Sequence, residues 1–137
     1  MNINIDFVNK LRISGLRPTK QRLKICEVLF NTEKTFHFTV NDLSKIISEK
    51  LNQKISLATI YNTVHAFKKK GYLKEISMNS DKTYFDTNTS HHHHFFDSST
   101  MKLIDLSDDQ VEKIKINKAL PGKKISSVEI LVKVENE

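Results

Sequence analysis

The sequence is poor in the residues that would crosslink the chain or hold it in a membrane. Its 137 residues include one cysteine, Cys26, which excludes an intramolecular disulfide and a four-cysteine zinc site within one chain. No stretch approaches the roughly 20 apolar residues that a membrane span requires. The first residues, MNINIDFVNKLRISG, lack the apolar core of a secretory signal. We therefore expect a cytoplasmic protein with no membrane partner, in which Cys26 is a small buried side chain on a helix.

Positive charge is abundant and is concentrated in the first half of the chain. Residues 1–74 contain 14 lysines and arginines against 5 acidic residues, a net charge of +9, whereas residues 75–137 contain 8 against 11, a net charge of −3. A basic surface attracts nucleic acid because it neutralises phosphates and releases counterions. Charge alone does not exclude a solvated lysine face, so the interpretation depends on the motifs.

The first half has the apolar periodicity of helices separated by short turns. Pro18 and Thr19 are placed to begin the second of three predicted helices, and Thr39 is placed to cap the third, with Asp42 completing a variant of the capping box. Gly15 suits the left-handed position that ends the first helix. The apolar residues that recur at helical spacing are Phe7, Val8, Leu11, Leu23, Cys26, Phe30, Val40, Leu43, Ile47 and Leu51.

Residues 56–70, SLATIYNTVHAFKKK, form the most informative predicted helix. Ser56 is placed to cap it and Gly71 to end it. One face is an apolar stripe that we expect to be buried, made of Leu57, Ile60, Val64 and Phe67. The remaining surface carries short hydrogen-bonding groups followed by positive charge, which suits phosphate oxygens and base edges in a major groove. These residues are Ser56, Thr59, Tyr61, Asn62 and Lys69.

Two short runs rich in β-forming residues follow this helix. YLKEIS at residues 72–77 and KTYFDT at residues 82–87 flank the turn-prone MNSD, a pattern that predicts a hairpin. Helices followed by a small hairpin make a winged helix-turn-helix, with residues 56–70 as the recognition helix. We therefore assign the chain to the α+β class, with a winged-helix DNA-binding domain at residues 1–86.

The remaining residues, 87–137, are predicted to form a small α/β domain. Alternation of apolar and polar residues predicts strands at 101–106 and 124–136, and Ser107 is placed to cap a helix over 107–120. One helix and a small sheet bury too little apolar surface to be stable without a partner. A second copy of the chain could bury the remaining apolar surface, so we expect this domain to form a homodimer.

Four consecutive histidines occupy residues 91–94. Such a run is by itself compatible with an expression scar or a solvated loop. If it is extended, successive side chains point to opposite faces, so that His92 and His94 form one pair and His91 and His93 the other. One pair binds a metal only weakly and needs further donors, for which the candidates are His37, Asp86 and Asp105.

Three imidazoles and two carboxylates suit Fe(II), Mn(II), Co(II) or Zn(II), and they leave three function classes open. A metal-dependent enzyme could use them, but no separate general base or substrate pocket can be identified, and the basic half would have no purpose. A metal buffer or chaperone would explain the histidines but not the recognition helix. A metal-responsive DNA-binding regulator explains both.

Five segments resemble the ferric uptake regulator (Fur) family of metal-dependent transcription factors. GLRPTKQR, HFTVNDL, ISLATIYNTVHAFKKKGYL, KTYFD and HHHHFF occur in the family's order and spacing, across about residues 15–106. SLATIYNT, TYFDTN and the histidine triplet before Phe-Phe look most like the iron response regulator (Irr) branch, which is associated with iron and haem status. The resemblance implies a sequence-specific transcriptional regulator, not an enzyme, whose operator binding responds to iron through a divalent metal or haem.

The resemblance also implies a regulatory metal site between the DNA-binding and dimerisation domains. Its ligands map onto His37, Asp86, His92, His94 and Asp105. The spacings between the last four look like those of the peroxide-sensing branch, so iron-dependent peroxide sensing is an alternative. The family's second site maps onto His91 or His93 and Glu112, but Val128 stands where a further histidine is expected, so that site looks degraded.

Other family features are missing or altered. Many members have a structural zinc site made of two Cys-x-x-Cys pairs, whereas Asp97 and Thr100 stand at the first pair here, so we expect no such zinc. Cys26 is followed by Glu27 rather than by the proline of a Cys-Pro haem motif, so any haem would have to use His92, His93 or His94. For operator DNA, the resemblance implies Arg17 in the minor groove, Tyr61 and Asn62 on bases, and Arg22, Ser56 and Thr59 on phosphates.

Overall fold

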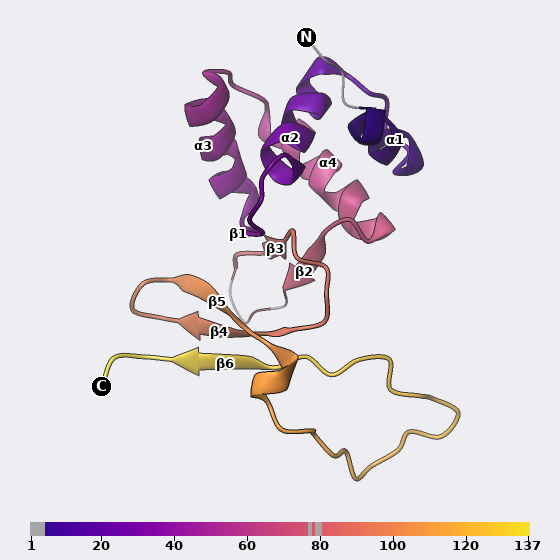
Figure 1. Ribbon diagram of the computed structural model, residues 1–137, viewed down its shortest axis with the longest axis vertical. Helices are drawn as coiled ribbons and strands as arrows, with labels where there is room; N and C mark the ends of the chain where they lie inside the picture. The colour runs from indigo at the N-terminus through magenta and orange to yellow at the C-terminus, as the bar shows by residue number, and fades with distance from the viewer. Residues whose placement is uncertain (1–4, 77, 79–80) are drawn as a thin grey trace. The chain divides into compact units, whose positions relative to one another are not determined.

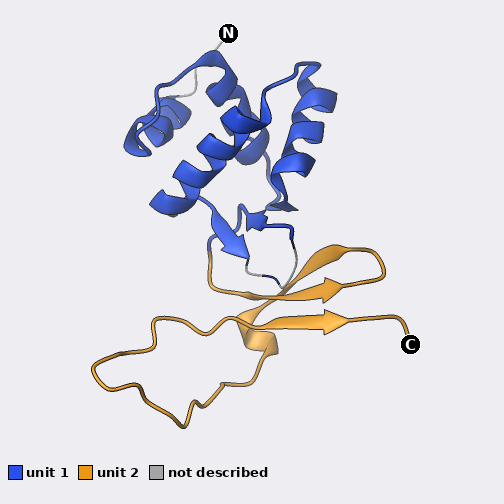
Figure 2. Cartoon of the chain, turned by 180° about the vertical axis from the view of Figure 1, so that it is seen from behind, with its two compact units in different colours: residues 1–89 blue, residues 90–137 orange. Residues whose placement is uncertain are grey.

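The computed structural model describes residues 5–76, 78 and 81–137. The chain divides into two compact units, residues 1–89 and 90–137 (Figure 2). Each unit has a three-stranded sheet of its own (Figure 1). No helix among these residues is both long enough and apolar enough to cross a bilayer.

The first unit is built around four α-helices within its described residues (Figure 1). They are α1 (Ile5–Ile13), α2 (Lys20–Phe30), α3 (Val40–Leu51) and α4 (Leu57–Lys70). Burying one large apolar side chain contributes about 1.5–3 kcal/mol, so a shared core holds the helices together. The core includes Leu11, Ile25, Cys26, Leu29, Phe38, Leu43, Ile47, Ile60, Val64 and Phe67, all of which are buried.

The helix boundaries follow the signals in the sequence. Thr39 and Asp42 form the predicted capping box, because each residue's backbone N–H donates to the other's side-chain oxygen at 3.0 Å. Ser56 Oγ accepts from the backbone N–H of Thr59 at 3.2 Å and so caps α4. Gly71 ends α4 with a φ of +83°, a conformation that favours glycine. These predictions are confirmed.

Leu57 is exposed, although the sequence predicts that the whole apolar stripe of α4 is buried. Its side chain is 51% exposed, whereas Ile60, Val64 and Phe67 are fully buried. Helical side chains lean toward the helix N-terminus, so the side chain of this first residue leans past the end of α4 rather than over the core. Thr63 is buried instead, and its hydroxyl donates to the carbonyl of Thr59 at 2.8 Å.

A small antiparallel sheet completes the first unit, in the order β1-β3-β2. The predicted hairpin strands are β2 (Lys74–Ile76) and β3 (Tyr84–Asp86). Residues 77, 79 and 80 of the connecting segment lie outside the described residues. The strand β1 (His37–Phe38) was not predicted and pairs with β3, placing His37 opposite Asp86.

The second unit is a sheet in the order β5-β4-β6 (Figure 1). The central strand β4 (His93–Asp97) is antiparallel to β5 (Lys102–Leu106) and parallel to β6 (Leu131–Val134). The strand predicted at 101–106 is therefore confirmed. The strand predicted at 124–136 is shorter than expected. Only Leu131–Val134 form β6, and they pair with residues 94–97 of β4.

The helix predicted over residues 107–120 is wrong. Only a short 3₁₀ turn, η1 (Asp108–Gln110), forms there, after Ser107 as predicted. Most helical stability in proteins comes from packing an apolar face against another element. Ile114, Ile116 and Leu120 are 41%, 51% and 63% exposed, so among the described residues this segment lacks the apolar cover that a helix needs.

Candidate functional site

The histidine run is extended, and its side chains alternate between two faces. His91 and His93 contact each other with ring centroids 5.2 Å apart, and His92 and His94 do so at 4.5 Å. Each pair shares its own aspartate, which is Asp108 for the first pair and Asp105 for the second. The run therefore forms two separate clusters, as the alternation of a strand requires.

His92, His94 and Asp105 form the first cluster. Asp105 stands opposite His94 in the β4–β5 register, which brings its carboxylate to the two imidazoles. Its Oδ1 atom lies 3.3 Å from His92 Nε2 and 3.6 Å from His94 Nε2. His92 and His94 are each only 5% exposed. Two buried imidazoles and one carboxylate thus converge within 4.8 Å of one another.

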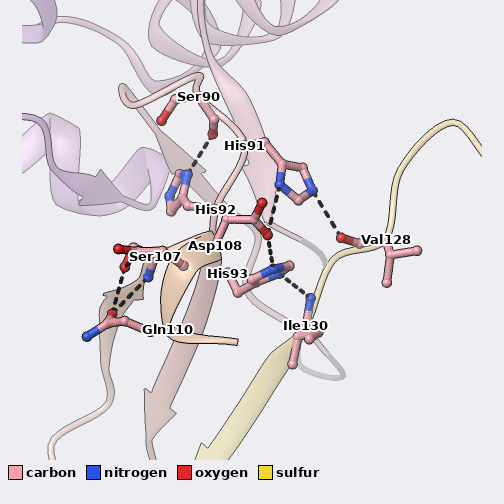
Figure 3. A network of polar contacts seen from close by, with 10 residues as sticks. Ser90, His91, His92, His93, Ser107, Asp108, Gln110, Val128 and Ile130 are labelled. Atoms are coloured by element: carbon pink, nitrogen blue, oxygen red, sulfur yellow. Dashed lines mark hydrogen bonds and ion pairs between the residues drawn. The ribbon is translucent and has the colours of Figure 1, made fainter. Parts of the chain in front are cut away.

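The ring of His92 is held in the orientation of a metal ligand. Its Nδ1 atom lies 2.7 Å from the carbonyl oxygen of Ser90 (Figure 3). A carbonyl only accepts hydrogen bonds, so Nδ1 carries the proton and donates it. The Nε2 atom faces Asp105 Oδ1 at 3.3 Å, so it is the ring nitrogen available to a metal ion.

In the second cluster, His93 uses its ring nitrogens differently from His92. His93 Nδ1 accepts a hydrogen bond from the backbone N–H of Ile130 at 3.1 Å, so the proton resides on Nε2, which donates to Asp108 Oδ1 at 3.0 Å (Figure 3). His91 Nε2 donates to the carbonyl of Val128 at 3.1 Å, and its Nδ1 lies 3.5 Å from Asp108 Oδ1. Both histidines contact the segment that leads into β6, and with Asp108 they form a second group of side chains that could hold a metal ion.

The carboxylate of this second cluster differs from the one expected. Glu112 lines the same cavity of about 430 Å³ as the two histidines, but Asp108 is the acidic residue bonded to them. The sequence signal was available, because Asp108 follows the predicted cap Ser107 and begins η1. It was missed because Glu112 was taken from the resemblance to the family's second site.

In the first unit, His37 and Asp86 form a pair. The His37 Nε2 atom lies 3.1 Å from Asp86 Oδ2, and the two residues are opposite each other in the β1–β3 register. Asp86 is 1% exposed, and its other oxygen accepts from the backbone N–H of Asn88 at 2.8 Å. A carboxylate this deeply buried requires compensation by hydrogen bonds or positive charge. An imidazole and a fixed carboxylate are thus presented together.

The N-terminal half of α4 presents the polar groups predicted to contact DNA. Ser56, Tyr61 and Asn62 are exposed, and Thr59 is partly so. The Tyr61 ring is stacked on His65, with centroids 5.7 Å apart and planes inclined by 7°. This stacking limits the rotation of the phenol while the residue stays 53% exposed. The helix therefore offers hydroxyl, amide and phenol groups on a rigid element.

The two predicted arginines lie near the start of α2. Arg17 is exposed, and the guanidinium of Arg22 donates to the Arg17 carbonyl at 3.0 Å. The backbone N–H of Arg22 donates to the Thr19 hydroxyl oxygen at 3.2 Å, which caps the helix. Both positive side chains thus belong to one ordered helix start in the basic unit.

Cys26 and Asp97, the latter at a position where many family members have a zinc-binding cysteine, both have structural roles here. Burial raises the pKa of the Cys26 thiol to about 12, so the thiol stays protonated and is a poor nucleophile at neutral pH. Asp97, which stands where a cysteine pair would begin, accepts from Ser99 Oγ at 2.6 Å and from Ser99 N–H at 2.9 Å. These bonds lower the pKa of Asp97 and close the β4–β5 turn.

The chain was compared with known proteins. The sequence model of the ferric uptake regulator family matches residues 13–133. The chain belongs to this family. Such proteins are transcription regulators, so the chain is a metal-responsive transcriptional regulator of the Fur family and not an enzyme.

Individual relatives extend this result. The peroxide-responsive repressor PerR of Staphylococcus epidermidis is 32% identical over 109 residues, which cover 80% of this chain and 71% of the relative. Among solved structures, the Vibrio cholerae ferric uptake regulator superposes with a TM-score of 0.69 at 23% identity, over 94% of this chain and 98% of that one. The Pseudomonas aeruginosa regulator with manganese gives 0.68 at 20%, over 96% and 98%. These structural likenesses confirm the α+β winged-helix fold.

Proposed function

We propose that this Fur-family regulator acts as a homodimer whose operator binding is controlled by one divalent ion held by His37, Asp86, His92, His94 and Asp105. The observation that carries this proposal is the convergence of His92, His94 and Asp105, because the two imidazole Nε2 atoms lie 3.3 and 3.6 Å from one carboxylate oxygen. His92 Nδ1 contacts the Ser90 carbonyl, so Nε2 is the ring nitrogen that faces Asp105. In metal sites, the ring nitrogen of a histidine that does not bind the ion commonly donates to a backbone carbonyl, which fixes the orientation of the ring.

The chemistry of the five donors supports this assignment. They comprise three imidazoles and two carboxylates, of which Asp86, His92 and His94 are buried. Such a borderline donor set suits Fe(II), Mn(II) or Zn(II) rather than Ca²⁺ or Mg²⁺. Buried carboxylates are costly without positive charge, and a bound ion would supply it. The manganese in the Pseudomonas aeruginosa structure fits the same range of ions.

The division of the ligands between two units suggests how binding would control DNA affinity. His37 and Asp86 belong to the DNA-binding unit, whereas His92, His94 and Asp105 belong to the second unit. Shared ligation by both sets would restrict the motion of one unit relative to the other. In a dimer, this restriction would shift the population toward one spacing of the two α4 helices, and a two-fold operator requires a fixed spacing.

We favour an ion over haem as the ligand, which weighs against the haem-linked part of the iron response regulator resemblance. The haem candidates His92, His93 and His94 alternate between faces, so they cannot all approach one macrocycle. The middle residue, His93, has both ring nitrogens committed to Ile130 and Asp108. Iron status would then reach the DNA through Fe(II) itself.

Peroxide is a second candidate signal, favoured by the name of the Staphylococcus epidermidis relative. The spacing of Asp86, His92, His94 and Asp105 also looks like that of the peroxide-sensing branch. The two candidates share the same ligands and differ in what releases the DNA. Loss of iron reverses on adding Mn(II) or Fe(II), whereas oxidative damage to a ligand would not.

The test is a selection of duplexes from a random DNA pool by untagged protein, with Mn(II) and with chelator. We expect Mn(II)-loaded protein to enrich one two-fold-related sequence and to bind it at least about tenfold more tightly or more weakly than the chelated protein does. Enrichment that is identical in both states would contradict metal control. Failure to enrich any sequence would contradict the DNA-binding role itself.

A further inference from the structure

An exposed apolar residue stands at the start of the proposed recognition helix. Leu57 is 51% exposed, although the other large aliphatic residues of α4, Ile60 and Val64, are fully buried. Leu57 and Tyr61 are four positions apart and therefore lie on the same face of the helix. The face that carries Tyr61 thus also carries an uncovered isobutyl group within one turn of it.

Besides Ala58 and Tyr61, the exposed neighbours of Leu57 on α4 are hydrogen-bonding groups. Ser56 and Asn62 are exposed, and Thr59 is partly exposed. A surface for another protein usually clusters apolar and aromatic side chains at its centre and lacks a strong excess of one charge. Residues 1–74 instead carry a net charge of +9, with Lys68, Lys69 and Lys70 at the other end of α4. This setting favours a duplex over a protein as the occupant.

We infer that Leu57 packs against the 5-methyl group of a thymine in the major groove and thereby helps to select the operator sequence. Thymine is the only base whose major-groove edge carries a methyl group, and apolar side chains read it by contact. This inference rests on the proposed DNA-binding role of α4 and adds a base preference to it. Ser56, Thr59 and Asn62 supply hydrogen bonds, and Leu57 supplies the apolar contact.

Helix geometry places Leu57 where such contacts are made. In helix-turn-helix proteins, residues near the N-terminus of the recognition helix meet the base edges. Leu57 is the first residue of α4, and side chains there lean beyond the helix end. The Tyr61 ring is held against His65 at 5.7 Å and so is directed along the same face. Leu57 is thus the apolar group at the leading end of the helix.

The test compares thymine with deoxyuridine, which lacks only the methyl group. Each thymine of the duplex selected by Mn(II)-loaded protein is replaced by deoxyuridine, one position at a time. Binding is then measured for wild type, Leu57→Ala, Leu57→Met and Ile13→Ala. Ile13 is the matched control, because it is 57% exposed in the same unit but lies on α1. Circular dichroism verifies that each variant is folded.

We expect wild type to lose roughly fourfold in affinity at one or two thymines per half-site, the effect of removing one buried methyl group. Leu57→Ala should bind the selected duplex that contains no deoxyuridine about tenfold more weakly than wild type does. Its binding should not change when deoxyuridine replaces thymine at those positions. Leu57→Met, which remains apolar, and Ile13→Ala should keep the wild-type sensitivity.

Three results would overturn the inference, and they are distinguishable. Equal binding of thymine and deoxyuridine duplexes by wild type, with preference for the selected sequence retained, removes the methyl contact and leaves the proposed function intact. A deoxyuridine effect of the same size in wild type and Leu57→Ala assigns the methyl contact to another residue. Loss of preference for any duplex would instead refute the proposed function, and the inference with it.

Discussion

His93 accepts a hydrogen bond from the backbone N–H of Ile130, with 3.1 Å between Nδ1 and the nitrogen. This bond reverses the tautomer found in the adjacent His92, whose Nδ1 donates to the Ser90 carbonyl. The two neighbouring imidazoles therefore have opposite roles. His92 presents Nε2 to a carboxylate, whereas His93 connects the strand β4 to the segment that leads into β6. Their difference separates the proposed metal site from the framework of the sheet.

His93→Ala should destabilise the second unit without changing Mn(II) affinity. The variant removes the acceptor of the partly buried Ile130 N–H and the donor to the exposed Asp108, and losing a typical hydrogen bond costs about 0.5–1.5 kcal/mol. Chemical denaturation measures the loss, and calorimetric titration measures Mn(II) affinity. His91→Ala is the matched control. Its side chain is 45% exposed, so we expect a smaller loss of stability. A stable His93→Ala protein with weakened Mn(II) binding would contradict this account.

Replacing Tyr61 and Asn62 together with Ala should abolish operator selectivity while leaving weaker, salt-sensitive binding to any duplex. Both side chains are exposed on α4, so their removal leaves the core intact. The basic surface of the first unit continues to neutralise phosphates. Competition between selected and scrambled duplexes gives the ratio of affinities, and its dependence on salt gives the phosphate contribution. A double variant that discriminates as strongly as wild type would show that another element reads the bases.

The protein should be a dimer at micromolar concentration both with Mn(II) and after chelation. The segment after η1 leaves Ile114, Ile116, Leu120 and Ile125 41–63% exposed, and such surface is stabilised by burial against a second copy. The proposed metal ligands lie elsewhere, and one chain lacks the cysteines for a structural zinc site. Sedimentation velocity decides the point. A monomer after chelation would mean that the ion holds the dimer together.

Features governed by contacts between near neighbours could be predicted from the sequence. The capping box of Thr39 and Asp42 depends on residues three positions apart, and the end of α4 depends on the freedom of Gly71 at positive φ. The division of the histidine run into two faces follows from the pleat of an extended chain. Each of these depends only on residues close together in the sequence, so the sequence alone predicts it.

Features that depend on distant packing could not be predicted in the same way. The apolar spacing of Leu57 fits the buried stripe of α4, but its exposure depends on where the core ends relative to the helix. Residues 107–120 have helical periodicity without the apolar cover that would stabilise a helix among the described residues. The pairing of His93 with Asp108 rather than Glu112 likewise depends on the path of the chain after β5, which the resemblance to the family does not specify.

The most direct test of metal control is Mn(II) titration and operator binding measured together on four single variants of the histidine run. His92→Ala and His94→Ala remove imidazoles from the proposed site, whereas His91→Ala and His93→Ala remove them from the opposite face. We predict that the first two lose most Mn(II) affinity and that their operator binding no longer depends on Mn(II), while the other two keep both. Equal losses across all four variants would contradict the two-face arrangement and reduce the run to a nonspecific chelating segment.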